Sequence, residues 1–273
     1  MTVRASFPVR APRFRFVQKE EDAQAIPRAW LGGSLYRTHR FNAFHMIFPH
    51  GEIYFLKSVN AFASRVTDPQ LAADIRSFVG QEGRHGHEHN RVVELMRGQG
   101  YEVDRWITRF RSALDRSQEV LPASWHLAAT AAGEHFTAVF ARTALDGRMR
   151  EYPAELERLF TWHAIEELEH KAVAFDVMRS VKIGYATRMV GLAIASYTLL
   201  SAWHNATLHL RKQDNLSAAD LKTGERETRA KNDLSWREIL RAAVQYARPG
   251  FHPNDDDDRE VLNAALAQWA AVL

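Results

Sequence analysis

Two parts of the chain repeat one arrangement of glutamate and histidine. In each, a glutamate stands alone among mostly apolar residues, Glu52 in IFPHGEIYFLKSV and Glu134 in AATAAGEHFTAVFA, and a Glu-x-x-His pair follows 30 or 33 positions later. A carboxylate that is buried without a positive partner costs free energy. Each lone glutamate therefore predicts a cation beside it.

The two pairs are Glu82-x-x-His85 and Glu167-x-x-His170. On a helix, a separation of three residues places side chains on adjacent turns, with Cβ atoms about 5 to 6 Å apart. One carboxylate and one imidazole of such a pair can then bind a single ion. In the second pair His163 shares the helical face, because it lies four residues before Glu167.

The order of lone glutamate, pair, lone glutamate, pair is known from ferritin-like di-iron and di-manganese bundles. Four carboxylates balance the charge of two divalent ions and neutral imidazoles add none, so such a site can be buried. The chain has no cysteine, which excludes thiolate ligands. We predict an all-α fold, a ferritin-like four-helix bundle with a di-metal carboxylate site and additional C-terminal helices. Its two metal ions would be iron in preference to manganese or zinc.

Two histidines compete for a further place in this site. We favour His163 as a third imidazole ligand; in the other interpretation, His163 only hydrogen-bonds a ligand. His89 is the alternative candidate for this place. Glu88, Glu166 and Glu169 point off the ligand face and are expected to meet solvent. A structural role is expected for His87, His126 and His135, because none of them stands at a helical spacing from another candidate ligand.

Prolines, glycines and capping residues divide the chain into helices. No sustained period-two alternation predicts strands. We expect an extended arm over residues 1–27, a bundle with an apolar fifth helix over 28–205 and a helical C-terminal extension over 206–273. The expected helices cover 28–66 with an interruption near Pro49 and Gly51 where Pro49 opens a new helix, 70–97 capped by Asp68, 104–118, 122–145, 153–180, 235–247 and 258–272.

Three segments carry expectations of their own. Basic residues of the arm predict a solvated tail rather than a contact with an anionic membrane; these are Arg4, Arg10, Arg13, Arg15 and Lys19. The fifteen residues of 189–203 fall short of the roughly 20 that span a bilayer, which favours a buried helix or a homodimer contact over a membrane-associated helix. The run Asp255 to Asp258 is expected to cap the last helix, with a calcium site as the alternative.

Overall charge and the N-terminus restrict the class of protein. The net charge of +3 is small for 273 residues and excludes a dedicated nucleic-acid binder. No apolar segment typical of a signal peptide is seen near the N-terminus, so a cytoplasmic location is expected.

Four blocks of the chain resemble, in matching order, a bacterial family of predicted metal-dependent hydrolases, over about residues 28 to 252. They are FPHGEIYF, QEGRHGHEH, GEHFTA and WHAIEELEHKAVAFD. The spacing His163-x-x-x-Glu167-x-x-His170 is also similar to that of di-iron N-oxygenases, whose substrate is not transferred because the apolar fifth helix differs. Carried over position by position, this second resemblance implies as metal ligands Glu52, Glu82, His85, Glu134, His163, Glu167 and His170.

These patterns predict a non-haem di-metal enzyme that acts on a small-molecule substrate. Our first expectation is an O2-activating oxidase or oxygenase for a small or apolar organic substrate, because carboxylates stabilise the higher oxidation state of a metal. The alternative is a metal-dependent hydrolase in which a metal pair generates hydroxide, although four anionic ligands weaken Lewis acidity. An iron-handling protein is a third class, for which a compact bundle without the C-terminal additions is expected.

Overall fold

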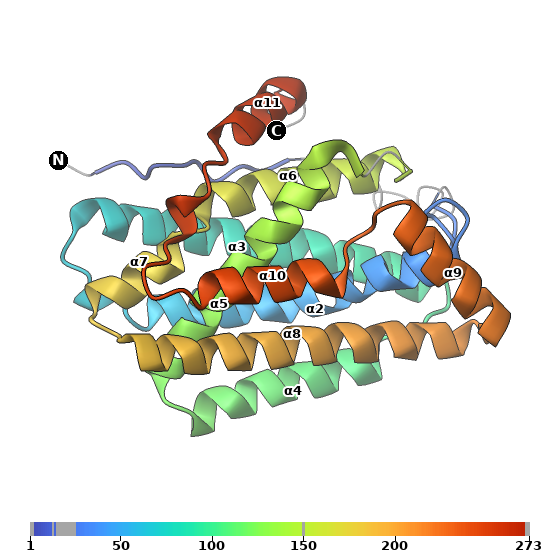
Figure 1. The fold of residues 1–273 in the computed structure, drawn as a ribbon, viewed down its shortest axis with the longest axis horizontal. Helices are drawn as coiled ribbons and strands as arrows, with labels where there is room; N and C mark the ends of the chain where they lie inside the picture. The colour runs from blue at the N-terminus through green and yellow to red at the C-terminus, as the bar shows by residue number, and fades with distance from the viewer. Residues whose placement is uncertain (1–2, 13, 15–25, 149–150, 271–273) are drawn as a thin grey trace.

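The computed structural model describes residues 3–12, 14, 26–148 and 151–270, and this part of the chain contains helices and no strand (Figure 1). The all-α prediction is therefore confirmed. The α-helices are α2 (Leu35–Asn60), α3 (Pro69–Gly98), α4 (Asp104–Val120), α5 (Ala123–Thr143), α6 (Ala154–His170), α7 (Val173–Ser180), α8 (Tyr185–Gln213), α9 (Ala218–Ala230), α10 (Trp236–Tyr246) and α11 (Arg259–Trp269). Three short turns are η1 (Ala63–Arg65), η2 (Ala144–Arg148) and η3 (Pro253–Asp255).

Helices α2, α3, α5 and α6 enclose the middle of the molecule, and α8 packs along α2 and α5. Helix α4 lies beside α8 on the outside of the bundle (Figure 1). A glycine permits the close approach of α5 and α8, because a Cβ atom on Gly191 would lie 2.3 Å from the carbonyl carbon of Ala128. Large side chains without solvent exposure fill the core, among them Phe78, Phe136 and Leu127.

Helix α3 begins and ends as its sequence predicts. The Asp68 carboxylate accepts a hydrogen bond from the backbone N–H of Gln70 at 2.9 Å, and Pro69 occupies the first helical position. Beyond the helix, Gly100 adopts a φ of +86°, which favours glycine. These local signals suffice to position the long helix that carries Glu82 and His85.

Pro49 does not open a new helix, and the expected interruption near Pro49 and Gly51 was wrong. Helix α2 runs without a break from Leu35 to Asn60, with Pro49 inside it. A proline inside a helix removes one backbone hydrogen bond. Packing compensates for this loss, because Pro49 is buried against α3 where a Cβ atom on Gly86 would lie 3.3 Å from the Pro49 carbonyl oxygen.

The helix expected over 153–180 is divided into α6 and α7 by a turn at Lys171 and Ala172. The division lies where the buried Lys171 ammonium group donates to the Asp256 carbonyl at 2.7 Å and to the Asp258 carboxylate at 2.6 Å. These partners come from a segment far along the chain, which is why helical periodicity alone did not indicate the turn.

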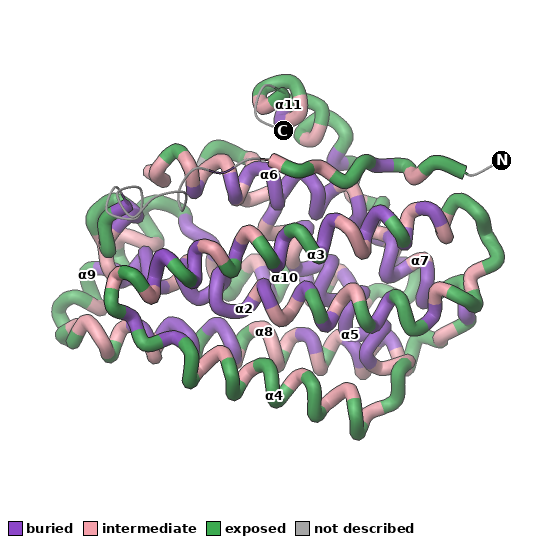
Figure 2. Tube along the Cα trace, turned by 180° about the vertical axis from the view of Figure 1, so that it is seen from behind, coloured by how far each residue is buried: buried purple, intermediate pink, exposed green. Residues whose placement is uncertain are grey.

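The described part of the N-terminal arm is not a solvated tail. Phe7 is buried, its carbonyl accepts from the Ser77 hydroxyl at 2.7 Å, and Arg10 forms ion pairs with Glu166 and Glu169. Figure 2 shows this segment lying along the bundle, and its contacts join α3 to α6. Only Arg4 among the described basic residues is exposed as expected, and Arg13, Arg15 and Lys19 lie outside the described residues.

Helix α8 contains the apolar segment 189–203 and buries part of it, including Ala195, Ala202 and Trp203, whereas Tyr197 is 76% exposed. Among the helices of the described residues, none combines the length and the apolar character needed to cross a membrane. Helix α9 lies in the C-terminal extension, and most of its residues are exposed.

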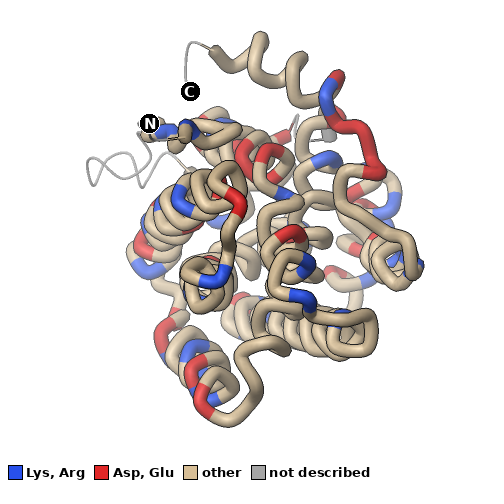
Figure 3. The backbone as a smooth tube through the Cα atoms, turned by 90° about the vertical axis from the view of Figure 1, so that its left-hand side faces the viewer, with Lys and Arg blue, Asp and Glu red and all other residues tan. Residues whose placement is uncertain are grey.

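The acidic run Asp255 to Asp258 leads into α11 (Figure 3). Only part of its expected capping role is seen, because Asp257 accepts from the backbone N–H of Arg259 at 3.1 Å while Asp258 makes no side-chain cap bond. Asp258 instead pairs with Arg142 at 2.6 Å and with the Lys171 ammonium group. Two buried or half-buried cations therefore determine the position of this run.

Candidate metal centre

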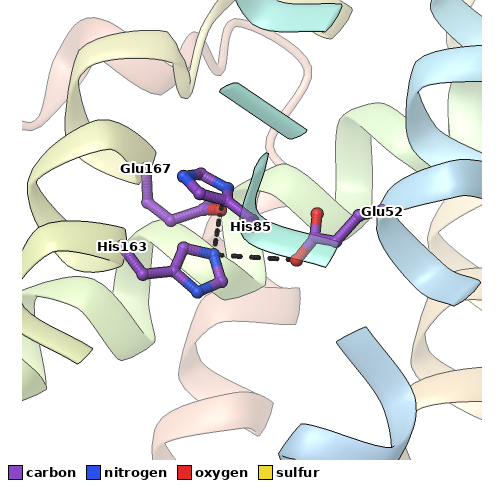
Figure 4. Close-up of side chains that lie close together, drawn as sticks. All are labelled: Glu52, His85, His163 and Glu167. Carbon is purple, nitrogen blue, oxygen red and sulfur yellow. Dashed lines mark hydrogen bonds and ion pairs between the residues drawn. The ribbon is translucent and has the colours of Figure 1, made fainter. Parts of the chain in front are cut away.

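All seven residues predicted as ligands meet in the core between α2, α3, α5 and α6, and all are buried. They form two groups, in each of which one ligand atom per residue lies within 4.8 Å of the others. Figure 4 shows the side chains of the first group pointing toward one another. The first group is Glu52, His85, His163 and Glu167, and the second is Glu82, Glu134 and His170.

Two glutamates lie between these groups. Glu82 Oε1 is 3.7 Å from His85 Nδ1 in the first group and 3.1 Å from His170 Nε2 in the second. Glu167 Oε1 is 2.7 Å from His163 Nε2, while its Oε2 is 3.5 Å from His170 Nε2. Each carboxylate therefore contacts imidazoles of both groups.

The two lone glutamates of the sequence each lie near one imidazole. Glu52 Oε1 is 3.6 Å from His163 Nε2, and Glu134 Oε2 is 3.2 Å from His170 Nε2. The first group thus contains two imidazoles and the second contains one. Two metal ions bound here would have unequal ligands.

Many ligand atoms at this centre lack a hydrogen-bond partner within the described part of the chain. They are both carboxylate oxygens of Glu52, Glu82 and Glu134, together with His85 Nδ1 and His170 Nε2. Buried polar atoms are nearly always hydrogen-bonded, and an unpaired buried charge is costly. A pair of divalent cations among these atoms would satisfy them and balance the four carboxylates, so the donor set fits such ions.

In the absence of metal ions, bound protons neutralise the buried carboxylates. Burial raises the pKa of Glu52 well above its usual range, and the neighbouring Glu82 raises it further. Burial likewise raises the pKa of Glu82 to about 7 and that of Glu134 to about 8. Burial alone would lower the pKa of His170, but the charges of Glu167 and Glu134 raise it well above its usual value.

Two of the three imidazoles are oriented by oxygen atoms behind them. His85 Nε2 lies 3.0 Å from Glu166 Oε2, and His170 Nδ1 lies 2.8 Å from Gln81 Oε1. These oxygens accept, so the ring nitrogen facing them donates. The other nitrogen of each ring, His85 Nδ1 or His170 Nε2, faces the carboxylates and would offer its lone pair to a metal ion bound among them. This is the arrangement by which an outer partner fixes the tautomer of a metal-binding histidine.

The third imidazole has another histidine behind it. His163 Nδ1 lies 2.7 Å from His89 Nε2, and His89 Nδ1 lies 2.7 Å from His45 Nδ1. His163 directs its Nε2 into the first group, while His89 stands one hydrogen bond further out. Of the two candidates for a further ligand, the geometry thus brings His163 into the centre.

The expectation that three neighbouring glutamates meet solvent was wrong, because none of the three is exposed. Glu166 is fully buried, and Glu169 pairs with Arg10 at 2.6 Å with only 8% of its side chain exposed. Glu88, also half-buried, lies 2.8 Å from Arg91 on the same helix. Burial of Glu166 opposes ionisation, but the hydrogen bond from His85 and the charge of Arg10 lower its pKa below the usual value.

Sequence reasoning missed the residues behind the ligands. Gln81 links His170 to the arm, because its Nε2 donates to the Pro8 carbonyl at 2.9 Å and to Glu169 Oε2 at 3.2 Å. Arg10 then closes the network by binding Glu169 and Glu166. The sequence offered one indication of these residues, because Gln81 and Glu166 each immediately precede a predicted ligand.

The histidines expected to be structural do lie outside both groups. His87 is exposed, with 72% of its side chain accessible. His126 Nδ1 lies 2.9 Å from the Tyr54 hydroxyl, and His135 Nε2 lies 3.0 Å from the Ala242 carbonyl. These contacts join α5 to α2 and to α10.

Two cavities reach the centre. A small one of about 70 Å³ touches His163 and Glu167 and is lined mainly by aromatic and alanine side chains, among them Phe44, Phe48 and Phe140. A larger one of about 670 Å³ reaches Glu52. Thr137 lines both, and its hydroxyl donates to Glu167 Oε2. Both cavities thus lead to the centre past mainly apolar side chains.

The chain matches, over residues 8–257, the model of a family described as predicted metal-dependent hydrolases. The chain belongs to this family. No curated protein and no solved structure matches it. Membership confirms the resemblance expected from the four sequence blocks, and the family's description agrees with the hydrolase alternative better than with our first expectation of an oxidase or oxygenase.

Proposed function

We propose that the chain is a non-haem enzyme with a dinuclear metal centre whose ligands are the seven buried carboxylates and imidazoles. The observation that carries this proposal is the set of buried, unpartnered ligand atoms on five of these residues. Hydrogen bonds alone would leave these atoms unsatisfied, whereas two cations would satisfy them together. Membership of a family described as metal-dependent supports the same conclusion.

For the reaction, we favour O2-dependent oxidation of an apolar organic substrate. The small cavity at Glu167 is walled by Phe44, Phe48 and Phe140, and such a lining suits an apolar substrate. Four anionic ligands also weaken the Lewis acidity of the ions. When bound, two iron ions would supply electrons for the reduction of O2.

The chain's own residues would orient the centre. Thr137 holds one oxygen of Glu167, and Glu166 holds the His85 ring. Phe48 packs edge-on against His163, with the ring centres 5.1 Å apart. These contacts restrict the ligands to one arrangement, as a preorganised site requires.

Metal-assisted hydrolysis is the second candidate, and the family description favours it. In that case the two metal ions would supply hydroxide at neutral pH and a binding position for the reacting oxygen of an ester, amide or phosphate. The same seven ligands would serve, and the larger cavity that reaches Glu52 gives water a path to them.

Metal loading followed by two parallel assays distinguishes these reactions. We expect purified protein to bind about two ions per chain, and the anaerobic Fe(II) form to consume O2 with a change in its near-ultraviolet and visible spectrum. The zinc form should be inactive in the same assay. Ester or phosphodiester hydrolysis by the zinc form without O2 would favour the second candidate, and protein that binds no metal would refute both.

A further inference from the structure

The larger cavity is a long trough between α4 and α8. Both helices lie side by side on the outside of the bundle (Figures 1 and 2). Ile194 and Lys212 both line the trough and are eighteen residues apart on α8, so it extends roughly 27 Å along this helix at about 1.5 Å per residue. Its volume of about 670 Å³ suits a small organic molecule.

The walls of the trough are largely apolar. Trp106 and Phe110 of α4 stack with ring centres 5.2 Å apart and line one side. Leu199 and Leu208 of α8 line the other. An extended apolar chain lying here would be desolvated along its length, which favours its binding.

The two ends of the trough differ in charge. Its outer end carries Arg109 and Lys212, both exposed and without an ion pair to any described residue. They lie toward the same end, because Arg109 is in the first half of α4 and the start of α4 meets the end of α8, where the Glu102 N–H donates to Gln213 at 2.8 Å. Glu52, in the metal centre, is the one acidic residue among the described residues that line the trough.

We propose that the trough binds a long, unbranched carboxylate of the fatty-acid type. Its carboxylate would pair with Arg109 and Lys212, its chain would follow α8, and its apolar end would reach Glu52 and Thr137 beside the metal centre. The opposite orientation would bring the anionic head to the glutamates. Turnover of this molecule rests on the proposed function, whereas its binding does not.

Calorimetric titration of the metal-loaded full chain with dodecanoate tests the proposal. Dodecanol and dodecylammonium are the comparison ligands, because they keep the chain and remove or reverse the charge. The variants are R109Q/K212Q at the outer end, S201F within the trough, and R105Q as a control whose exposed arginine on α4 does not line the trough. Metal content is measured for every variant.

We expect dodecanoate to bind more tightly than dodecanol, and dodecylammonium to bind weakest. R109Q/K212Q should weaken dodecanoate about fivefold to tenfold and leave dodecanol unchanged, as expected for exposed ion pairs. S201F should abolish binding of both ligands, and R105Q should have no effect. Metal content should stay the same throughout.

Equal affinities for the three ligands, or unchanged binding to S201F, would overturn the proposal. Absence of binding to protein that holds about two metal ions would also overturn it, while leaving the proposed function intact. Binding of dodecanoate by protein that takes up no metal would support the trough and refute the dinuclear centre. A dimer that forms through α8 and prevents dodecanoate from binding would show that a second copy occupies the trough.

Discussion

Glu166 Oε2 lies 3.0 Å from His85 Nε2, on the side of the imidazole opposite the candidate metal centre. Arg10 of the N-terminal arm lies 3.4 Å from the other oxygen of the same carboxylate. The arm thus contacts a predicted ligand through one intermediate residue. This relationship connects a segment at the start of the chain to the chemistry of the core.

Glu166→Gln should weaken binding of one metal ion about 10-fold to 100-fold, because the amide accepts a hydrogen bond from His85 less strongly and gives the ring no negative partner. Competition with a chromophoric chelator measures this change. Glu88→Gln is the matched control, since Glu88 pairs with Arg91 on the outer side of the same bundle. Equal losses in both variants would contradict a specific role for Glu166.

Arg10→Gln should weaken metal binding less than Glu166→Gln, by a few fold, because it acts through Glu166 and Glu169. It should also lower the midpoint of thermal unfolding, since two buried carboxylates lose their cation. Differential scanning calorimetry and the same chelator competition give both quantities. Arg4→Gln, at an exposed position of the arm, should change neither.

How far the sequence predicts this molecule depends on the kind of signal. Glu52 and Glu134 could be found because each is the one acidic residue of an apolar helical segment, and the three-residue spacing in Glu82-x-x-His85 placed the other ligands. The structure brings all seven candidates together. The ligands could be predicted from the local sequence because a charged residue among apolar neighbours needs a partner once it is buried.

Features that depend on distant contacts could not be predicted. The continuity of α2 through Pro49 depends on packing against Gly86, and the turn at Lys171 lies where this residue binds Asp258. The burial of Glu166 depends on an arm more than 150 residues earlier in the chain. The periodicity of a helix does not indicate such partners, because the sequence patterns of the basic arm and of the helix that carries Glu166 are the same whether or not the two segments are in contact.

The stability of the metal-free protein should fall as pH rises from about 7 to about 9, by roughly 1 to 3 kcal/mol. Glu82 and Glu134 have folded-state pKa values of about 7 and about 8, above the unfolded value, so the folded state binds more protons and loses this advantage as they ionise. Histidines whose pKa is lowered by burial, such as His45, are neutral in both states in this range.

Urea unfolding at several pH values, with and without metal, measures this dependence. In the metal-loaded protein the carboxylates are ionised and paired with cations, so its stability should change little over the same range. A metal-free protein that becomes more stable toward pH 9 would contradict the proton-for-metal exchange.

Glu134→Gln should affect the two forms of the protein in opposite directions. In the metal-free protein at about pH 9, the variant should be more stable than the wild type by on the order of 2 kcal/mol, because a neutral amide of the same shape replaces a buried carboxylate whose ionisation is unfavourable. In the presence of metal the order should reverse, since the variant lacks one anionic ligand and should lose at least one ion per chain. Unfolding curves and metal analysis on the same samples measure both effects. Replacing a carboxylate that only holds helices together would destabilise the protein both with and without metal. A variant that is more stable than the wild type without metal and less stable with metal therefore identifies Glu134 as a metal ligand.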